Sequence, residues 1–343
     1  MTITNFERWS RTDINDTDRK RAELKEAILA RYDAKDLEEA LKKSGIPEKT
    51  AVIYIFGGAG TRWIDSLKEH RDDFPDINPD KPRCLAPVDN LFPTIPDKKV
   101  PIGIYNFYAG LGLGSHIMIY STYQDEIASE IVAPFNAKVR YSRQEVCNRI
   151  GKVAGHGDAV RQAKELWKDS SYVAVLQCNE VYSRSNLILS LFLLHLLDKE
   201  GADVVHLLPM QYLDQPIYPP ILDKDNIPIG TYQEKLTGIA PPPGPGLSNI
   251  GQRLYTTADF LAKMEYIERV TKNTGSYAWL NPVNHNDEFA LDHIDMMAMN
   301  ERRARISPVC YAEEWSGAKK VTDIARWKAA QAKVYERDGI IKF

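Results

Sequence analysis

Cysteine is scarce in this sequence, and the usual marks of a secreted protein are absent as well. The 343 residues include four cysteines, and no two of them have the Cys-x-x-Cys spacing of a zinc cluster. We therefore expect a reducing compartment rather than a disulfide framework. The first residues, MTITNFERWS, contain no basic stretch followed by an apolar core, so we predict no secretion signal. These absences favour a cytoplasmic protein.

Long hydrophobic runs and an excess of positive charge are missing too. The longest apolar run, residues 187–197, is broken by Ser190 and His195 and is too short to span a bilayer, so we expect a buried helix there. The formal net charge of −3 gives no general affinity for nucleic acid or for a membrane surface. An anionic ligand must therefore be held by a few local residues. No internal repeat of roughly 20–50 residues is present.

Residues 15–45 carry the first helical pattern. Apolar residues recur there at helical spacing among many charges, and Gly45 and Pro47 end the pattern. We predict an N-terminal helical extension over residues 1–48. It packs either on the main body or on another subunit of a homo-oligomer, and the sequence leaves both alternatives open.

Residues 49–343 alternate short, β-rich apolar runs with helical patterns. Such alternation indicates an α/β domain with a mixed, mostly parallel sheet and helices on both faces. The predicted strands are residues 51–56, 116–120, 172–176 and 203–208. The predicted helices are roughly residues 104–111, 124–132, 158–168 and 186–198, with a C-terminal helix at about 320–337.

A glycine-dense loop follows the first predicted strand, in the stretch YIFGGAGTRW. Glycines at positions 57, 58 and 60 let the backbone approach a phosphate, because no Cβ stands in the way. Arg62 adds a fork of donors that can bind two phosphate oxygens. Open α/β sheets bind ligands at the carboxyl ends of such strands. The alternative is an ordinary glycine turn with a surface arginine, and the stretch matches neither a P-loop nor a complete GxGxxG pattern.

Further motifs follow this loop in a fixed order. They are KPRCLAPV at 81–88, GHGDAV at 155–160, VLQCNEVY at 175–182, QEK at 233–235, SNIG at 248–251 and AWLN at 278–281. With GGAGTRW, the series resembles the sugar-1-phosphate nucleotidylyltransferases, or nucleotide-sugar pyrophosphorylases, over about residues 51–301. The resemblance implies a Rossmann-like, GT-A-like fold whose sugar-phosphate-binding part covers about residues 209–300. It also implies transfer of a nucleotidyl group from an NTP to a sugar 1-phosphate, or to a related cyclitol phosphate, with release of pyrophosphate.

The resemblance implies a role for each motif. Contacts to the triphosphate would come from Gly57, Gly58, Ala59, Gly60 and Thr61, and Arg62 would neutralise the leaving pyrophosphate. Lys81 or Arg83 would contact phosphate, with Arg83 at the position where the family usually has lysine. The other nucleotide contacts would come from Gln144, Gly155, Gly157, Asp158 and Asn179. The sugar phosphate would be bound by Glu234, Lys235, Asn249 and Gly251, with Lys235 also acting in catalysis; a turn-forming Ser-Asn pair and a hairpin Glu-Lys pair are the alternative.

Two positions depart from the family pattern. The family's two metal-binding aspartates correspond to Asn179 and Asn281. Mg²⁺ prefers charged oxygen ligands, so its binding is expected to be weakened. Three alternatives remain open. Nearby acids hold the metal in place of the missing aspartates, or cationic side chains take over the role of the metal. In the third alternative, the chain binds nucleotide or sugar phosphate without transferring a nucleotidyl group. The acids in question are Glu180, Asp158 and Asp287, and the cations are Arg83, Lys81 and Lys235.

Two further alternatives concern the same region. A cluster of acids and histidines could hold a metal, although such a cluster on a helix is more often a solvated face. It consists of His285, Asp287, Asp292, His293 and Asp295. A glycosyltransferase would need an Asp-x-Asp motif after a sheet strand, which Asn179 and Glu180 do not supply.

Overall fold

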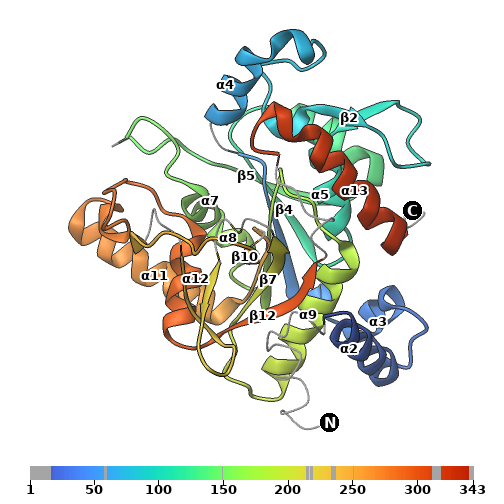
Figure 1. Cartoon of the computed structure of the whole chain (residues 1–343), viewed down its shortest axis with the longest axis vertical. Coiled ribbons are helices and arrows are strands. Elements are labelled where there is room, and N and C mark those ends of the chain that lie inside the picture. Colours follow the sequence, from blue (N-terminus) through green and yellow to red (C-terminus); the bar gives the residue numbers. More distant parts are fainter. Residues whose placement is uncertain are drawn as a thin grey trace.

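A central eight-stranded sheet with helices on both faces organises the chain (Figure 1). The computed structural model describes residues 17–57, 60–148, 150–213, 216, 219–232, 237–249, 251–310 and 318–339. The strands of the central sheet lie in the order β10-β7-β11-β6-β1-β4-β5, and β12 also pairs with β7. This arrangement confirms the predicted α/β class with a mostly parallel sheet.

The parallel half of the sheet contains the strands that lead into the predicted motifs. It consists of β1 (Thr50–Ile55), β4 (Ser115–Tyr120), β5 (Val139–Arg143) and β6 (Tyr172–Gln177). Beyond β6, β11 (Arg253–Thr256) runs antiparallel to both β6 and β7 (His206–Leu213). β7 also pairs with β10 (Gly246–Asn249) and β12 (Ala304–Cys310). Two separate pairs are β2 (Pro87–Asp89) with β3 (Lys99–Pro101) and β8 (Pro220–Leu222) with β9 (Pro228–Thr231).

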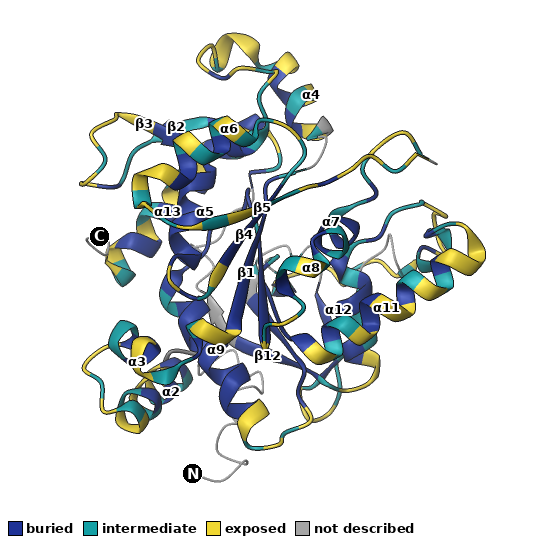
Figure 2. Ribbon diagram, turned by 180° about the vertical axis from the view of Figure 1, so that it is seen from behind, coloured by how far each residue is buried: buried dark blue, intermediate teal, exposed yellow. Residues whose placement is uncertain are grey.

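Alternate residues of β1 face opposite sides of the sheet. Val52 and Tyr54 join the core formed with α5 (Gly103–Gly110), α9 (Arg184–Lys199) and α13 (Ile324–Asp338). Ala51 and Ile53 join the other core, with α7 (His156–Gln162), α8 (Lys164–Trp167), α11 (Thr257–Thr274) and α12 (Leu291–Asn300). Every residue of β1 is buried, as the dark central strands of Figure 2 show. Burial on both faces explains why its sequence is apolar without alternation.

Several predicted elements differ in their bounds from the observed ones. The helix predicted at 158–168 is divided into α7 and α8. The one at 124–132 is α6 (Gln124–Ile127) continued by a π-helix, Ala128–Val132. The last predicted strand begins at His206 rather than at residue 203. Among the described helices, none is long and apolar enough to cross a bilayer.

The N-terminal extension is a pair of helices, so the prediction of a single helix over 15–45 is wrong. α2 (Thr17–Tyr32) ends before Asp33, whose φ of 47° lies outside the helical region. α3 (Leu37–Ser44) then begins afresh, because the Asp36 carboxylate accepts a hydrogen bond from Glu39 N at 2.8 Å. Leu24 and Ile28 of α2 are fully buried in the core that includes α9. Of the two alternatives for this extension, it packs on the main body.

Candidate functional site

The candidate site lies where the carboxyl ends of the parallel strands meet. Phe56, just after β1, donates its N–H to Ile119 O at 2.8 Å, and Cys178 N donates to Ile55 O at 3.3 Å. The ends of β4 and β6 are thereby attached to the two sides of β1, next to Gly57. The chain passes from β1 to β4 and β5 on one side and returns to β6 on the other. Open α/β sheets bind ligands at such a reversal of strand order.

Gln144 packs against Gly57. Its N–H donates to Tyr120 O at 2.7 Å, and its side chain donates from Nε2 to Gly155 O at 2.9 Å. A Cβ built at position 57 would lie 3.1 Å from Gln144 Oε1, so glycine leaves the room that this amide occupies. The structure therefore brings together three of the predicted nucleotide-binding residues, Gly57, Gln144 and Gly155.

Asn179 holds Arg83 at the end of β6. Arg83 Nη2 donates to Asn179 Oδ1 at 2.9 Å, and Asn179 Nδ2 donates to Glu180 Oε1 at 3.1 Å. Asn179 and Glu180 are each 4% exposed. Because the carboxylate of Glu180 takes the amide nitrogen, the amide oxygen faces Arg83. Among the described residues, no carboxylate forms an ion pair with Arg83, so its guanidinium keeps its positive charge next to Asn179.

The turn between β10 and β11 lies against Glu180. Asn249 Oδ1 accepts a hydrogen bond from Gly251 N at 3.0 Å, which closes the turn. Gly251 has a φ of 79°, and a Cβ there would lie 3.3 Å from Glu180 Cγ. The structure thus places the turn that contains two predicted sugar-phosphate residues against Glu180. The side-chain oxygen of Asn249 forms a hydrogen bond within the turn, as in the alternative interpretation of a turn-forming Ser-Asn pair.

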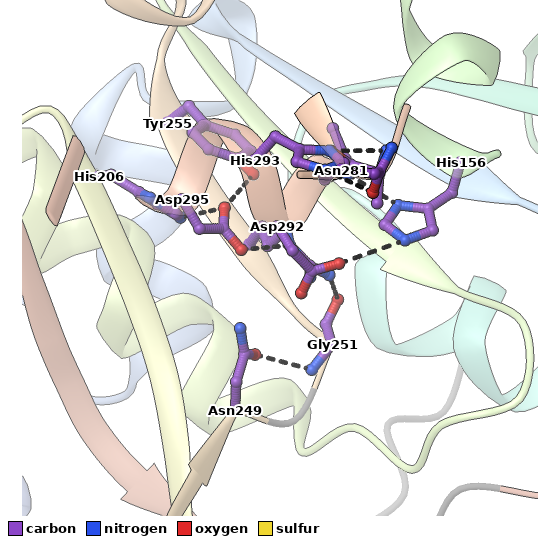
Figure 3. A network of polar contacts seen from close by, with 12 residues as sticks. His156, His206, Asn249, Gly251, Tyr255, Asn281, Asp292, His293 and Asp295 are labelled. Carbon is purple, nitrogen blue, oxygen red and sulfur yellow. Dashed lines mark hydrogen bonds and ion pairs between the residues drawn. The ribbon is translucent and has the colours of Figure 1, made fainter. Parts of the chain in front are cut away.

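A buried network around Arg253 anchors this turn; Figure 3 shows Asp292 and Asp295 of the network near Asn249 and Gly251. Arg253 is 2% exposed and donates to Gly251 O at 3.0 Å. Its other nitrogens donate to Asp295 and Asp292, each at 2.8 Å. Burial raises the pKa of Asp295, whereas Arg253 and His156 outweigh burial at Asp292 and hold the pKa of that carboxyl below its usual range. Two helix carboxylates therefore neutralise one arginine and anchor the turn.

This network corrects the prediction for the acid and histidine cluster. Asp295 also accepts from Tyr255 OH at 2.7 Å, and His293 is 6% exposed. The part of the chain that the structure describes contains no group of three or more His, Cys, Asp or Glu side chains that could hold a metal ion. Asp292, His293 and Asp295 are therefore neither a metal site nor a solvated face. Asp292 and Asp295 face Arg253, whereas His293 faces Asn281.

Gly155 and Gly157 allow α7 to dock on the loop before α12. Gly157 N donates to Phe289 O at 2.9 Å, and Phe289 N donates to Ala154 O at 2.7 Å. A Cβ at position 155 or 157 would lie 2.6 or 2.8 Å from Phe289 O. Close approach between two backbone segments accounts for both glycines. A nucleobase is not needed to explain them.

Asp158 is engaged within the protein. Its carboxylate accepts from Arg161 at 2.8 Å, from Gln162 at 2.7 Å and from Tyr277 OH at 2.9 Å, and the residue is 2% exposed. These contacts hold α7 to the segment that follows α11. They leave no free face of Asp158 for a nucleotide or a metal.

Asn281 needs its amide for structural reasons. Its Nδ2 donates to Asn286 O and to Glu288 O, each at 2.8 Å, and its Oδ1 lies 3.2 Å from His293 Nε2. The side chain therefore closes the loop ahead of Phe289 and is 4% exposed. Both of its polar atoms are in use, so Asn281 is not available as a metal ligand.

The Mg²⁺ ion that the resemblance implies does not fit the described residues. Asn179 offers its oxygen to Arg83, and Asn281 is committed to its loop. Glu180 is the remaining acid at this edge, and one carboxylate with a guanidinium close by is a poor site for a small divalent cation. The other two proposed substitutes are engaged within the protein: Asp158 in the contacts given above, and Asp287 as acceptor from Tyr277 N at 2.6 Å.

The other predicted residues are dispersed or lie outside the described part. Gly60 has a φ of 58° and precedes α4 (Thr61–Glu69), on whose first turn Arg62 is exposed. Lys81 pairs with Glu130 at 3.3 Å and lines a separate cavity of about 340 Å³ beside Trp63. The predicted residues outside the described part are Gly58, Ala59, Glu234 and Lys235.

Sequence reasoning missed several polar residues at this edge. Asn106 of α5 is 1% exposed and donates to Gln177 O, and Tyr182 OH accepts from Gln177 N at 2.8 Å. A lone asparagine inside the apolar stretch GIYNFYAG was the available signal for Asn106. Arg253, inside the β-rich stretch RLYT, was a similar signal, since a buried arginine needs partners.

The largest of the described cavities lies at the opposite end of the sheet. It measures about 800 Å³ and is lined by the amino ends of β4 and β5 together with α3. Residues 58–59 and 233–236, which include four of the predicted site residues, are outside the described part. The candidate site is therefore defined by convergent residues rather than by a cavity volume.

Comparison with known proteins gives little further guidance. No protein-family model matches the chain, and neither does any curated protein. Among solved structures, the crystal structure of HddC from Yersinia pseudotuberculosis is similar, with 16% sequence identity and a TM-score of 0.49. The match covers 82% of this chain and 99% of that chain. A likeness at this level says nothing about the activity of this chain.

Proposed function

We propose that this chain is a nucleotidyltransferase of the pyrophosphorylase type. It would join an NTP to a hexose 1-phosphate, or to a related cyclitol phosphate. In this reaction a phosphate oxygen of the acceptor attacks the α-phosphorus and forms a new P–O bond. The bond from that phosphorus to the bridging oxygen breaks, and pyrophosphate leaves with the electron pair. The acceptor oxygen is already ionised, so the protein has to orient the substrates and neutralise charge.

The observation that carries the proposal is that Gly57 with Gln144, and Asn179 with Arg83, follow the ends of neighbouring strands where the strand order reverses. Gly57 offers close backbone approach, and Arg83 offers a guanidinium without a carboxylate partner. A guanidinium binds two phosphate oxygens at once, which suits a triphosphate. The Asn249–Gly251 turn beside Glu180 supplies an adjoining wall for the acceptor.

A pyrophosphate-release assay tests the proposal. The protein is incubated with each of four NTPs and a panel of sugar and cyclitol phosphates, and released pyrophosphate is measured through a coupled pyrophosphatase. We expect release with at least one pair, dependent on both substrates. Release without acceptor would indicate NTP hydrolysis instead.

A second candidate function is binding of nucleotide or sugar phosphate without transfer. The replacement of both expected aspartates by Asn179 and Asn281, each committed to protein partners, favours it. It predicts measurable nucleotide binding but silence with every substrate pair. Release of pyrophosphate with any pair would contradict it.

A further inference from the structure

The residue at position 179 decides what charge Arg83 can offer. Asn179 Oδ1 accepts from Arg83 Nη2 at 2.9 Å, so the amide oxygen orients the guanidinium. An aspartate at the same place would orient it too, but would also neutralise it as an ion pair. An amide oxygen is uncharged, and it leaves the full positive charge of the arginine for another anion.

Glu180 ensures that Asn179 presents its oxygen and not its nitrogen. The amide nitrogen donates to Glu180 Oε1 at 3.1 Å, and both residues are 4% exposed. Reversing the amide would set a carboxylate against the amide oxygen and a donor against a guanidinium. The order Glu180, Asn179, Arg83 therefore has one satisfied arrangement.

A magnesium ion would compete with this arrangement. It would need the oxygen that Arg83 already uses, and it would lie close to a fixed positive charge. The second expected ligand, Asn281, has both polar atoms engaged in its own loop. The described residues therefore provide a cation of their own in place of a metal site.

We propose that Arg83, oriented by Asn179 and Glu180, supplies the charge that holds the triphosphate, and that the triphosphate binds without a divalent metal. The inference rests on the proposed function for the identity of the ligand. It adds that Arg83 acts through phosphate contact, whereas Asn179 is a positioning residue.

Calorimetric titration of the full chain with each of four NTPs tests the inference, once with EDTA and once with MgCl₂. We expect at least one NTP to bind equally well in both buffers. Arg83→Gln should weaken that binding by about ten- to a hundredfold, as expected for a lost charge-assisted hydrogen bond. Arg83→Lys keeps the positive charge but loses the paired donors of the guanidinium. Its affinity for the NTP should therefore lie between those of the wild type and of Arg83→Gln.

Asn179→Asp gives a readout that a merely structural role would not produce. The new carboxylate would neutralise Arg83, so NTP binding should weaken in EDTA and remain weak with MgCl₂. The matched control is Arg140→Gln, an exposed arginine on β5 whose guanidinium contacts Ser115 at the other end of the sheet. It should leave NTP binding unchanged, and circular dichroism verifies that each variant is folded.

The outcomes separate this inference from the proposed function. Binding that requires magnesium, or an Arg83→Gln variant that binds like the wild type, would overturn the inference alone. Metal-independent binding without pyrophosphate release would uphold the inference and contradict transfer. Absence of NTP binding in both buffers would overturn the proposed function and the inference with it.

Discussion

At the scale of single residues, the choice between amide and carboxylate decides what each position can do. Asn179 and Asn281 occupy corresponding places in the motif series but serve different neighbours. One orients a guanidinium at the sheet edge, and the other closes a loop through main-chain carbonyls. Restoring aspartate at both positions would therefore have two different effects.

Asn281→Asp should destabilise the fold rather than create a metal site. The carboxylate would face the carbonyl oxygens of Asn286 and Glu288, which now accept from the amide. Loss of two buried hydrogen bonds should lower the free energy of unfolding by about 2–3 kcal/mol. Urea denaturation measures the change. Asn286→Asp, an exposed position in the same loop, is the control and should be near neutral.

The sequence identified these residues but not their partners. The replacement of expected aspartates by Asn179 and Asn281 was visible in the motifs. Their hydrogen bonds were not, because Arg83 and Asn179 are far apart in the chain and meet only through the sheet topology. Glu234 and Lys235 lie outside the described residues, so their roles stay predictions.

At the scale of elements, the docking of α7 on the loop before α12 depends on close backbone approach. Gly155→Ala would place a Cβ 2.6 Å from Phe289 O at a φ of 96°. We expect a loss of more than about 3 kcal/mol in the free energy of unfolding, because the atoms that would have to move are backbone atoms of Phe289 and not the end of a flexible side chain.

The control for this prediction is Gly201→Ala. Gly201 also has a positive φ, 74°, but nothing lies within 4 Å of the added Cβ. Gly201→Ala should lower the free energy of unfolding by about 1 kcal/mol, because only the strain of an alanine at positive φ contributes. Equal losses for the two variants would show that crowding against Phe289 is unimportant.

The glycines of this element illustrate a limit of pattern reasoning. The two glycines of GHGD indicated positions where the backbone has no room for a Cβ, and the structure has such positions at Gly155 and Gly157. The resemblance implied that these glycines contact a nucleotide, whereas the protein's own Phe289 lies against them. A pattern shows that a Cβ is excluded, but not which group excludes it.

At the scale of the whole molecule, one buried arginine attaches the N-terminal extension. Arg184 at the start of α9 forms two hydrogen bonds with Glu38 of α3, at 2.7 and 2.8 Å, and also donates to carbonyls at the end of α5. Arg184→Met should lower the free energy of unfolding by about 3 kcal/mol, because those partners lose their donor. Lys68→Met, which removes an exposed pair with Asp65, should change it by less than about 0.5 kcal/mol.

Acid should weaken the fold through buried histidines. Burial lowers the pKa of His116 and of His195 from 6.5 to about 4. Between these values the unfolded chain binds protons that the folded chain does not, so stability is complete above pH 6.5 and falls as the pH drops toward 4. Each histidine contributes a slope of up to about 1.4 kcal/mol per pH unit.

Urea denaturation across this pH range checks the expectation. His116→Phe should reduce the slope, because a side chain that cannot be protonated replaces the buried ring. A slope that is the same in the wild type and in His116→Phe would contradict the account.

The overall fold was more predictable than the site. Continuous apolar runs such as Ala51–Phe56 follow from burial on both faces of a sheet, and helix periodicity does not depend on distant partners. The single long N-terminal helix was wrong because the pattern continues through the turn at Asp33. Site chemistry depends on contacts between distant segments, which no local pattern specifies.

A crystal structure with a bound NTP tests the central claim most directly. The account predicts phosphate oxygens within hydrogen-bonding distance of the Gly57 loop and of the Arg83 guanidinium, with Asn179 still bound to Arg83. A nucleotide bound instead in the cavity at the amino ends of β4 and β5, or phosphates held away from Arg83, would contradict it.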